Sequence, residues 1–209
     1  MTFSPTRSRS PLLVLLALTA FVAALQLSGC GGGDTSNPLD NPPTVGNPPG
    51  RSGQALSFVY FQKCINPIFL KQLQAGGSTN TCAGSGCHDN TSGTGGAFRV
   101  IQSAAEVDLA DAANTPDVVR TSDMFKNFYS AQGSAQIGDP QHSRLLNKPL
   151  VRGILHGGGQ VFADENDADA QRIRYWISRP VPQGADEFTP TAAAMFTPAD
   201  PETGTCNTQ

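Results

Sequence analysis

The stretch that most constrains this chain is Cys82-Ala-Gly-Ser-Gly-Cys87-His88, in which a histidine directly follows the second of two cysteines. Two thiols can bond covalently to the two vinyl groups of a haem, and a histidine beside the second thiol can then bind the iron axially. The usual spacing is C-x-x-C-H, and here two more residues separate the cysteines. Because two of the four intervening residues are glycines, this loop can bulge and still span the porphyrin. The pattern predicts one covalent haem c, held by Cys82 and Cys87, with His88 as the proximal iron ligand.

Two other interpretations of the same residues stay open. Cys82 and Cys87 could close a short local disulfide, as cysteines of exported proteins often do. Alternatively, both thiols and His88 could hold a zinc ion together with a fourth ligand, although thiols in an oxidising compartment tend to be oxidised.

Residues 1–29 have the pattern of a targeting segment rather than of a folded domain. A basic start precedes an apolar run over Pro11–Leu27, which ends in a Leu-Ser-Gly-Cys30 sequence similar to a bacterial lipobox. We expect a lipoprotein signal peptide cleaved before Cys30, with Cys30 lipidated as a membrane anchor. Because Gly31 rather than aspartate follows, the expected location is the outer membrane, facing the periplasm. Plain secretion with a free Cys30 is the alternative.

The rest of the chain divides by composition. Residues 30–53 are rich in proline and glycine and predict a disordered, extended linker. The haem domain is expected over 54–180, followed by a C-terminal tail, 181–209, that is rich in proline, threonine and alanine. With 22 glycines, 16 prolines and only 15% charged residues, the chain predicts a small domain with long loops. Its net charge of -3 and the lack of a basic stripe argue against a nucleic-acid partner.

Apolar periodicity and capping signals predict four helical segments in this domain. The first covers Leu56–Gln74, with a kink or break at Pro67. The second begins at Thr115-Pro-Asp117 and runs to about Ala131, a short one covers 139–146, and the last covers Asp167–Ser178. The fold class is therefore expected to be mainly α.

Several of these segments resemble bacterial c-type cytochrome domains. Phe61-Gln-Lys-Cys-Ile-Asn-Pro-Ile-Phe69, followed by the Cys87-His88 pair, is similar to the opening of such domains. Ser143-Arg-Leu-Leu-Asn-Lys-Pro149, the His156-Gly-Gly-Gly run, Phe162 and Tyr175-Trp-Ile177 are similar to their second half. The resemblance covers roughly residues 58–179. It implies a small cytochrome-c-like helical fold whose first and last helices pack together near one haem edge.

For the distal iron ligand we favour His156, because its glycines permit a close approach and because the resemblance places it in a shared loop. Met124, on a helix facing the core, is the alternative, and His142 lies in a polar turn. With both axial positions filled, the iron would carry electrons rather than catalyse a reaction, and the partners would be redox proteins of the envelope. A peroxidase-like enzyme and a cofactor-free, disulfide-stabilised lipoprotein are the alternatives.

Once Cys30, Cys82 and Cys87 are assigned, Cys64 and Cys206 remain, and we predict a disulfide between them. A bridge across so long a loop stabilises the fold by about 4 to 5 kcal/mol in the chain-entropy model. If Cys82 and Cys87 carry no haem, four cysteines allow three pairings and this assignment is open.

Overall fold

The computed structural model describes residues 55–73, 80–182 and 184–209. The predicted signal peptide, Cys30 and the linker lie outside them. Within the described residues, 34% are helical and 5% are in strands, and the scarcity of strands confirms that the domain is mainly α-helical. None of the helices found there is long and apolar enough to cross a membrane.

The first helical segment is built from three short pieces: α2 (Phe58–Tyr60), the π-helical turn η1 (Phe61–Ile65) and α3 (Asn66–Leu70). Ser57 caps its start, since its hydroxyl accepts the Tyr60 N–H at 3.1 Å. Pro67 lies in the first turn of α3, where its missing N–H is tolerated. At the expected break the helix does not stop; the π-helical turn η1 changes to the α-helix α3 just before Pro67. The segment ends at Leu70, short of the expected end, because Lys71 adopts extended backbone.

The prediction of one helix from Thr115 to about Ala131 was wrong. The structure has two helices, α4 (Pro116–Val119) and α5 (Asp123–Gly133). Ser122 between them adopts extended backbone, and its hydroxyl accepts the Phe125 N–H at 3.1 Å. This new N-cap starts α5, so a local serine cap outcompetes continuation of the helix.

The later helices follow their sequence signals closely. A 3₁₀ turn, η3 (Pro140–His142), and α6 (Arg144–Asn147) occupy the expected short segment. The last long helix, α7 (Ala168–Ile177), begins at the N-cap Asp167, whose Oδ1 accepts the N–H groups of Asp169 and Ala170 at 2.9 and 3.3 Å. Asp167 therefore caps the start of this helix.

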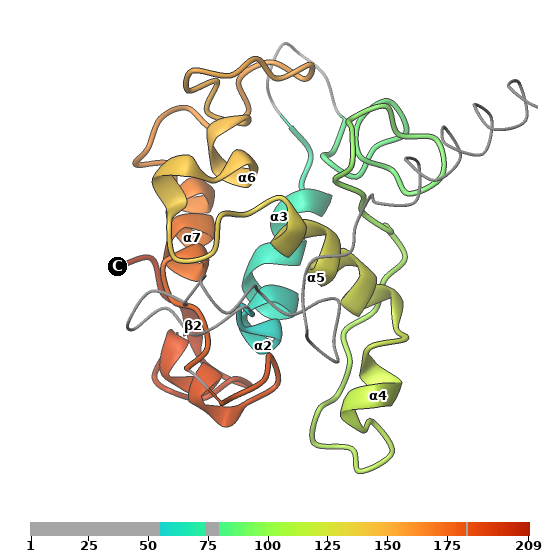
Figure 1. Cartoon of the computed structure of the whole chain (residues 1–209), viewed down its shortest axis with the longest axis vertical. Helices are drawn as coiled ribbons and strands as arrows, with labels where there is room; N and C mark the ends of the chain where they lie inside the picture. The colour runs from blue at the N-terminus through green and yellow to red at the C-terminus, as the bar shows by residue number, and fades with distance from the viewer. Residues whose placement is uncertain (1–54, 74–79, 183) are drawn as a thin grey trace, which may run out of the picture. The chain divides into compact units, whose positions relative to one another are not determined.

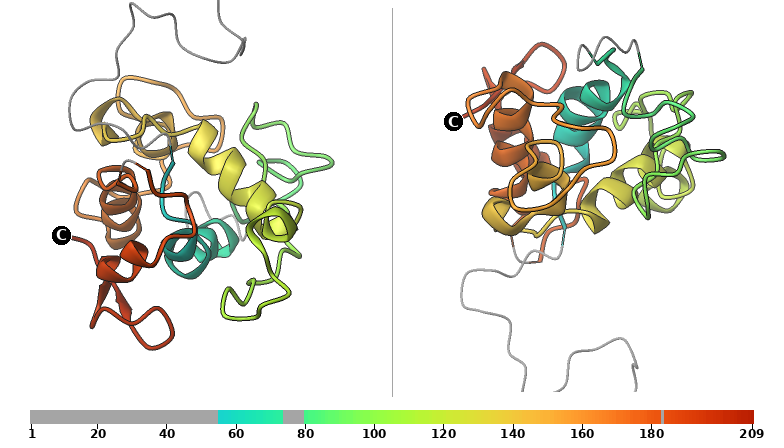
Figure 2. Two further views of the ribbon diagram at one scale, coloured as in Figure 1. Left: turned by 60° about the horizontal axis from the view of Figure 1, so that its bottom comes forward. Right: turned by 90° about the horizontal axis from the view of Figure 1, so that it is seen from above.

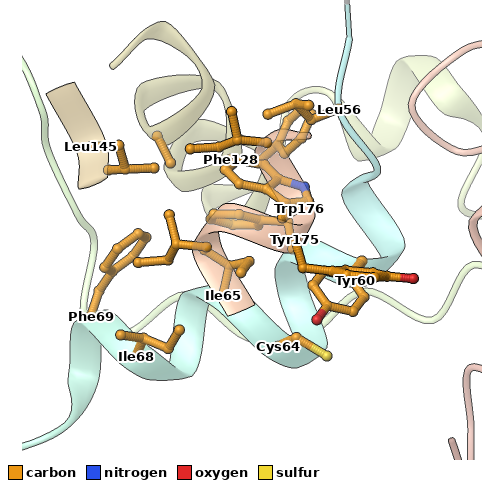
Figure 3. Packing of buried hydrophobic residues seen from close by; sticks show 14 of the residues in the cluster. Leu56, Tyr60, Cys64, Ile65, Ile68, Phe69, Phe128, Leu145, Tyr175 and Trp176 are labelled. Atoms are coloured by element: carbon orange, nitrogen blue, oxygen red, sulfur yellow. The ribbon is translucent and has the colours of Figure 1, made fainter. Parts of the chain in front are cut away.

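The first helical segment lies between α7 and α5 in all three views (Figures 1 and 2). On the α7 side, the Trp176 Nε1–H donates to the Ser57 carbonyl at 2.9 Å, and the Phe61 and Trp176 rings lie 5.5 Å apart. On the α5 side, Phe128 meets Phe61 edge-on at 5.5 Å. Figure 3 shows this core, with Trp176 and Phe128 gathered over Ile65. First and last helices therefore pack directly against each other.

Residues 181–209 fold back onto the first segment. They contain the 3₁₀ helix η4 (Pro190–Met195) and a two-stranded antiparallel sheet of β1 (Phe196–Thr197) and β2 (Thr205–Cys206). Phe196 is buried against Tyr60, with ring centres 5.4 Å apart. Cys64 and Cys206 form a disulfide with a Cα–Cα distance of 5.8 Å. The predicted tail is part of the same core.

Candidate haem site

The cysteine motif lies in an irregular loop after α3. Its extra length is taken up by a tight turn, because the Cys87 N–H donates to the Gly84 carbonyl at 2.9 Å and leaves Ser85 and Gly86 exposed at the tip. The His88 N–H donates to the Cys82 carbonyl at 2.9 Å. The first cysteine is therefore held beside the histidine despite the longer spacing, as the bulged-loop interpretation expects.

Both thiols of the motif are unpaired and half-buried. Burial raises the pKa of the Cys82 thiol to about 11, and repulsion from an ionised Cys87 adds to this rise. The thiol is therefore protonated at neutral pH, which keeps it a weak nucleophile until another group draws the proton away. The structure contains no local Cys82–Cys87 disulfide.

His88 is fixed by main-chain groups on the far side of this loop. Its Nδ1 is 3.0 Å from the Phe98 carbonyl oxygen, and the two rings have centres 4.7 Å apart. The Val100 N–H donates to the His88 carbonyl at 2.7 Å, which ties the two chain segments together. Because a carbonyl only accepts, Nδ1 carries the proton, and in the neutral imidazole the Nε2 lone pair is left for a metal.

The electrostatics around His88 favour that neutral imidazole. Burial lowers the pKa of His88, while the hydrogen bond to the Phe98 carbonyl acts in the opposite direction. Repulsion from His156, Arg99 and Lys148 lowers the pKa of His88 further. An unprotonated Nε2 is the form that binds iron, so the same environment that disfavours imidazolium favours ligation.

His156 lies in the loop between α6 and α7 and has a similar main-chain anchor. Its Nδ1 is 2.8 Å from the Gly159 carbonyl oxygen, while the Gly159 N–H donates to the His156 carbonyl at 2.9 Å. Gly159 has φ +74°, which favours glycine, so the tight turn depends on it. The loop is closed at its base by Pro149, whose carbonyl accepts the Val161 and Phe162 N–H groups at 2.8 and 3.3 Å.

The structure brings together two histidines from different loops, one before α4 and one between α6 and α7. Their ring centres lie 6.2 Å apart and their planes differ by 12°. Neither Nε2 has a hydrogen-bond partner among the described residues. Histidine nitrogens bind transition metals at about 2 Å and the ring centre lies about 1.1 Å further back, so two imidazoles across one metal ion have centres about 6.2 Å apart. The separation of the ring centres matches that value, which makes His88 and His156 the candidate pair of iron ligands.

The other sequence candidates for the distal position lie in different surroundings. Met124 on α5 is 2% exposed and belongs to the hydrophobic core. His142 is at the surface, where its Nδ1 pairs with the Asp139 carboxylate at 2.8 Å. Within the described part of the chain, no group of three or more His, Cys, Asp or Glu side chains is placed to hold a metal ion by itself. The zinc interpretation therefore has no complete ligand set there.

Two contributors to the site were missed from the sequence. The Phe98 carbonyl anchors His88, but a main-chain acceptor leaves no mark in the residue pattern. Gly95 lies directly against the His88 ring, and a β-carbon at this position would be 2.5 Å from the ring atoms Cε1 and Nδ1. The glycine-rich stretch after His88 is the sequence signal for this contact.

No known protein family, curated protein or solved structure matches this chain.

Proposed function

We propose that this protein is a monohaem c-type cytochrome that carries electrons in the bacterial cell envelope and is anchored to the membrane by lipid at Cys30. The observation that carries the proposal is the pairing of His88 with His156 at 6.2 Å and 12°, beside two unpaired cysteines of the haem-attachment type. The two histidines are 68 positions apart in the sequence, and the Nδ1 of each lies within hydrogen-bond distance of a main-chain carbonyl, which leaves each Nε2 available for a metal.

In this proposal each residue has a defined task. Cys82 and Cys87 would hold a haem through thioether bonds, and His88 and His156 would be the ligands of its iron. A bound haem supplies reversible one-electron exchange at its iron. The carbonyls of Phe98 and Gly159 hold the imidazoles in the tautomer that binds metal and increase the basicity of each ligand. With two protein ligands the iron has no open position for a substrate, which favours a carrier over a peroxidase-like enzyme.

The packing of the helices supports the same proposal. First and last helices pack through Phe61, Trp176 and the Ser57 carbonyl, as the resemblance to c-type cytochrome domains implies. The cysteine motif also follows the first helical segment in the sequence. We therefore propose that the finer fold is cytochrome-c-like.

The proposed location is the outer membrane, facing the periplasm, with other envelope redox proteins as partners. The Cys64–Cys206 disulfide supports an oxidising compartment. Residues 1–29 and Cys30 supply the export and lipidation signals on which the anchor depends.

The test is expression of the full-length chain in a bacterial host that exports proteins and attaches haem c. We expect a red protein whose haem stays on the polypeptide after denaturation, and whose intact mass includes one haem. The pyridine haemochrome spectrum should be that of two thioether bonds. The matched variant C82A/C87A should lose the covalent haem while keeping the Cys64–Cys206 disulfide. A colourless wild-type protein from this host would refute the proposal and leave a cofactor-free lipoprotein.

A further inference from the structure

Each of the two histidines has a glycine against its ring. A β-carbon at Gly95 would lie 2.5 Å from Cε1 and Nδ1 of His88 and 2.8 Å from the Cys87 carbonyl oxygen. A β-carbon at Gly158 would lie 3.3 Å from Cε1 and 3.7 Å from Nδ1 of His156. Neither glycine has a positive φ, so backbone freedom does not explain them. At both positions a β-carbon would press on an imidazole, with outright overlap at Gly95 and a tight contact at Gly158.

The missing β-carbons leave the space that each ring occupies. The hydrogen bond between Nδ1 and a carbonyl fixes one atom of the imidazole but still permits the ring to tilt about the bond to its own β-carbon. A β-carbon at either glycine would meet Cε1 and Nδ1 and push the ring out of its present plane. The hydrogen bond and the missing β-carbon therefore together permit the ring planes observed at the two histidines, which differ by 12°.

From this geometry we infer that Gly95 and Gly158 are positioning residues that set the mutual angle of the two axial imidazole planes. The inference rests on the proposed haem function. It assigns the stronger effect to Gly95, because a β-carbon there overlaps the ring outright, whereas at Gly158 the contact is tight but can relax by a few tenths of an ångström.

The plane angle has a direct spectroscopic readout. Near-parallel imidazoles split the iron d orbitals strongly and give low-spin ferric iron a rhombic EPR spectrum, whereas perpendicular planes give a spectrum with one very large g value. Ligand orientation is also one of the means by which a protein adjusts the electronic properties of a bound metal. A residue with a purely structural role would alter thermal stability without moving the g values.

The experiment compares the haem-loaded wild-type protein with Gly95→Ala, Gly158→Ala and a matched control, Gly133→Ala. The control position has open space for a β-carbon and no positive φ. We expect a rhombic wild-type spectrum, a small increase of the largest g value in Gly158→Ala and a larger increase, or loss of His88 ligation, in Gly95→Ala. The control should keep the wild-type spectrum. In the reduced, diamagnetic wild-type protein, an NMR cross-relaxation signal between the Gly95 α-protons and the His88 Cε1 proton should report the contact directly.

If Gly95→Ala does not fold or bind haem, Gly158→Ala decides the question alone. Wild-type g values in Gly158→Ala, or equal shifts in Gly158→Ala and Gly133→Ala, would overturn the inference while the haem function stands. A wild-type protein without haem would refute the proposed function first, and this inference with it.

Discussion

The phenol of Tyr60 donates a hydrogen bond to the main-chain carbonyl of Asn207, 147 residues further along the chain. Tyr60 lies on α2 and is fully buried, while Asn207 follows β2 near the C-terminus. The Tyr175 ring of α7 lies 5.6 Å from the Tyr60 ring, and its hydroxyl accepts the Asn207 side-chain N–H at 3.4 Å. One buried phenol thus links the first helix, the last helix and the C-terminal residues.

Burial raises the pKa of Tyr60 above its usual value of 10, and repulsion from an ionised Tyr175 raises it further. Above pH 10 the folded protein therefore holds a proton that the unfolded chain releases, so the free energy of unfolding falls as the pH rises. We predict that Tyr60→Phe loses about 1 kcal/mol of stability at pH 8, because the hydrogen bond is gone. Between pH 9 and 11, the free energy of unfolding should fall by a smaller amount in Tyr60→Phe than in the wild type.

Urea unfolding followed by far-UV circular dichroism, at several pH values, measures both effects. Tyr129→Phe is the matched control, because Tyr129 is 68% exposed, and it should keep the alkaline slope of the wild type. Equal slopes in wild type and Tyr60→Phe would show that another group causes the alkaline loss.

The disulfide attaches the same C-terminal segment to the π-helical turn at Cys64. Because it closes a loop of 142 residues, its removal releases much conformational entropy in the unfolded chain. We predict that the double variant C64A/C206A loses about 2 to 4 kcal/mol of unfolding free energy, the typical range for a disulfide. Its haem content and visible spectrum should be unchanged, because neither cysteine belongs to the proposed haem site.

Thiol titration of denatured wild-type protein provides the control for this variant. Haem-loaded protein should show no free thiols from this pair, and Cys206→Ala alone should be about as destabilised as the double variant. Two titratable thiols in the wild type, with no loss of stability in the double variant, would exclude the bridge in solution.

The fold was predictable where a local signal and the apolar pattern agreed. Asp167 and the spacing of Ile173, Trp176 and Ile177 gave α7 within a residue at each end. The break at Ser122 was missed because the apolar periodicity continues across it, and only the hydrogen bond from its hydroxyl shows that the cap is used. Packing of the C-terminal residues depends on contacts such as Tyr60 with Asn207, which no local window of sequence contains.

The parts of the site that are side chains were predictable. The cysteines and histidines can be read directly from the sequence, and the glycines after His156 indicated a close approach. The geometry depends on main-chain atoms instead: the carbonyls of Phe98 and Gly159 and the bare α-carbon of Gly95. Carbonyls are present at every position and the chain has 22 glycines, so the sequence does not show which of them is used.

The exposed turn between the cysteines gives a test of the unusual motif. Ser85 and Gly86 form its tip, while the main-chain bond from His88 to Cys82 already holds the base together. Deleting Ser85 and Gly86 restores the C-x-x-C-H spacing. We predict that the deletion variant still binds haem covalently, at a yield at least equal to that of the wild type in a host with ordinary attachment machinery. Haem stain on denaturing gels and intact mass measure this yield. Loss of attachment would mean that the longer turn is itself required.

The distal ligand decides whether the iron is closed to small molecules. In His156→Ala the haem should remain covalently attached, because both thiols and His88 are unchanged. One axial position would then be vacant, so the low-spin spectrum should give way to a high-spin one. The reduced variant should bind about one carbon monoxide per haem, where the wild type binds none. His142→Ala is the control, because that side chain is 80% exposed and paired with Asp139, and it should behave as the wild type. A His156→Ala protein that stays low-spin and shows a near-infrared sulfur-to-iron band would assign the distal iron position to a methionine. Met124 would then be the first residue to replace by mutagenesis. That result would require α5 to turn a core residue towards the iron.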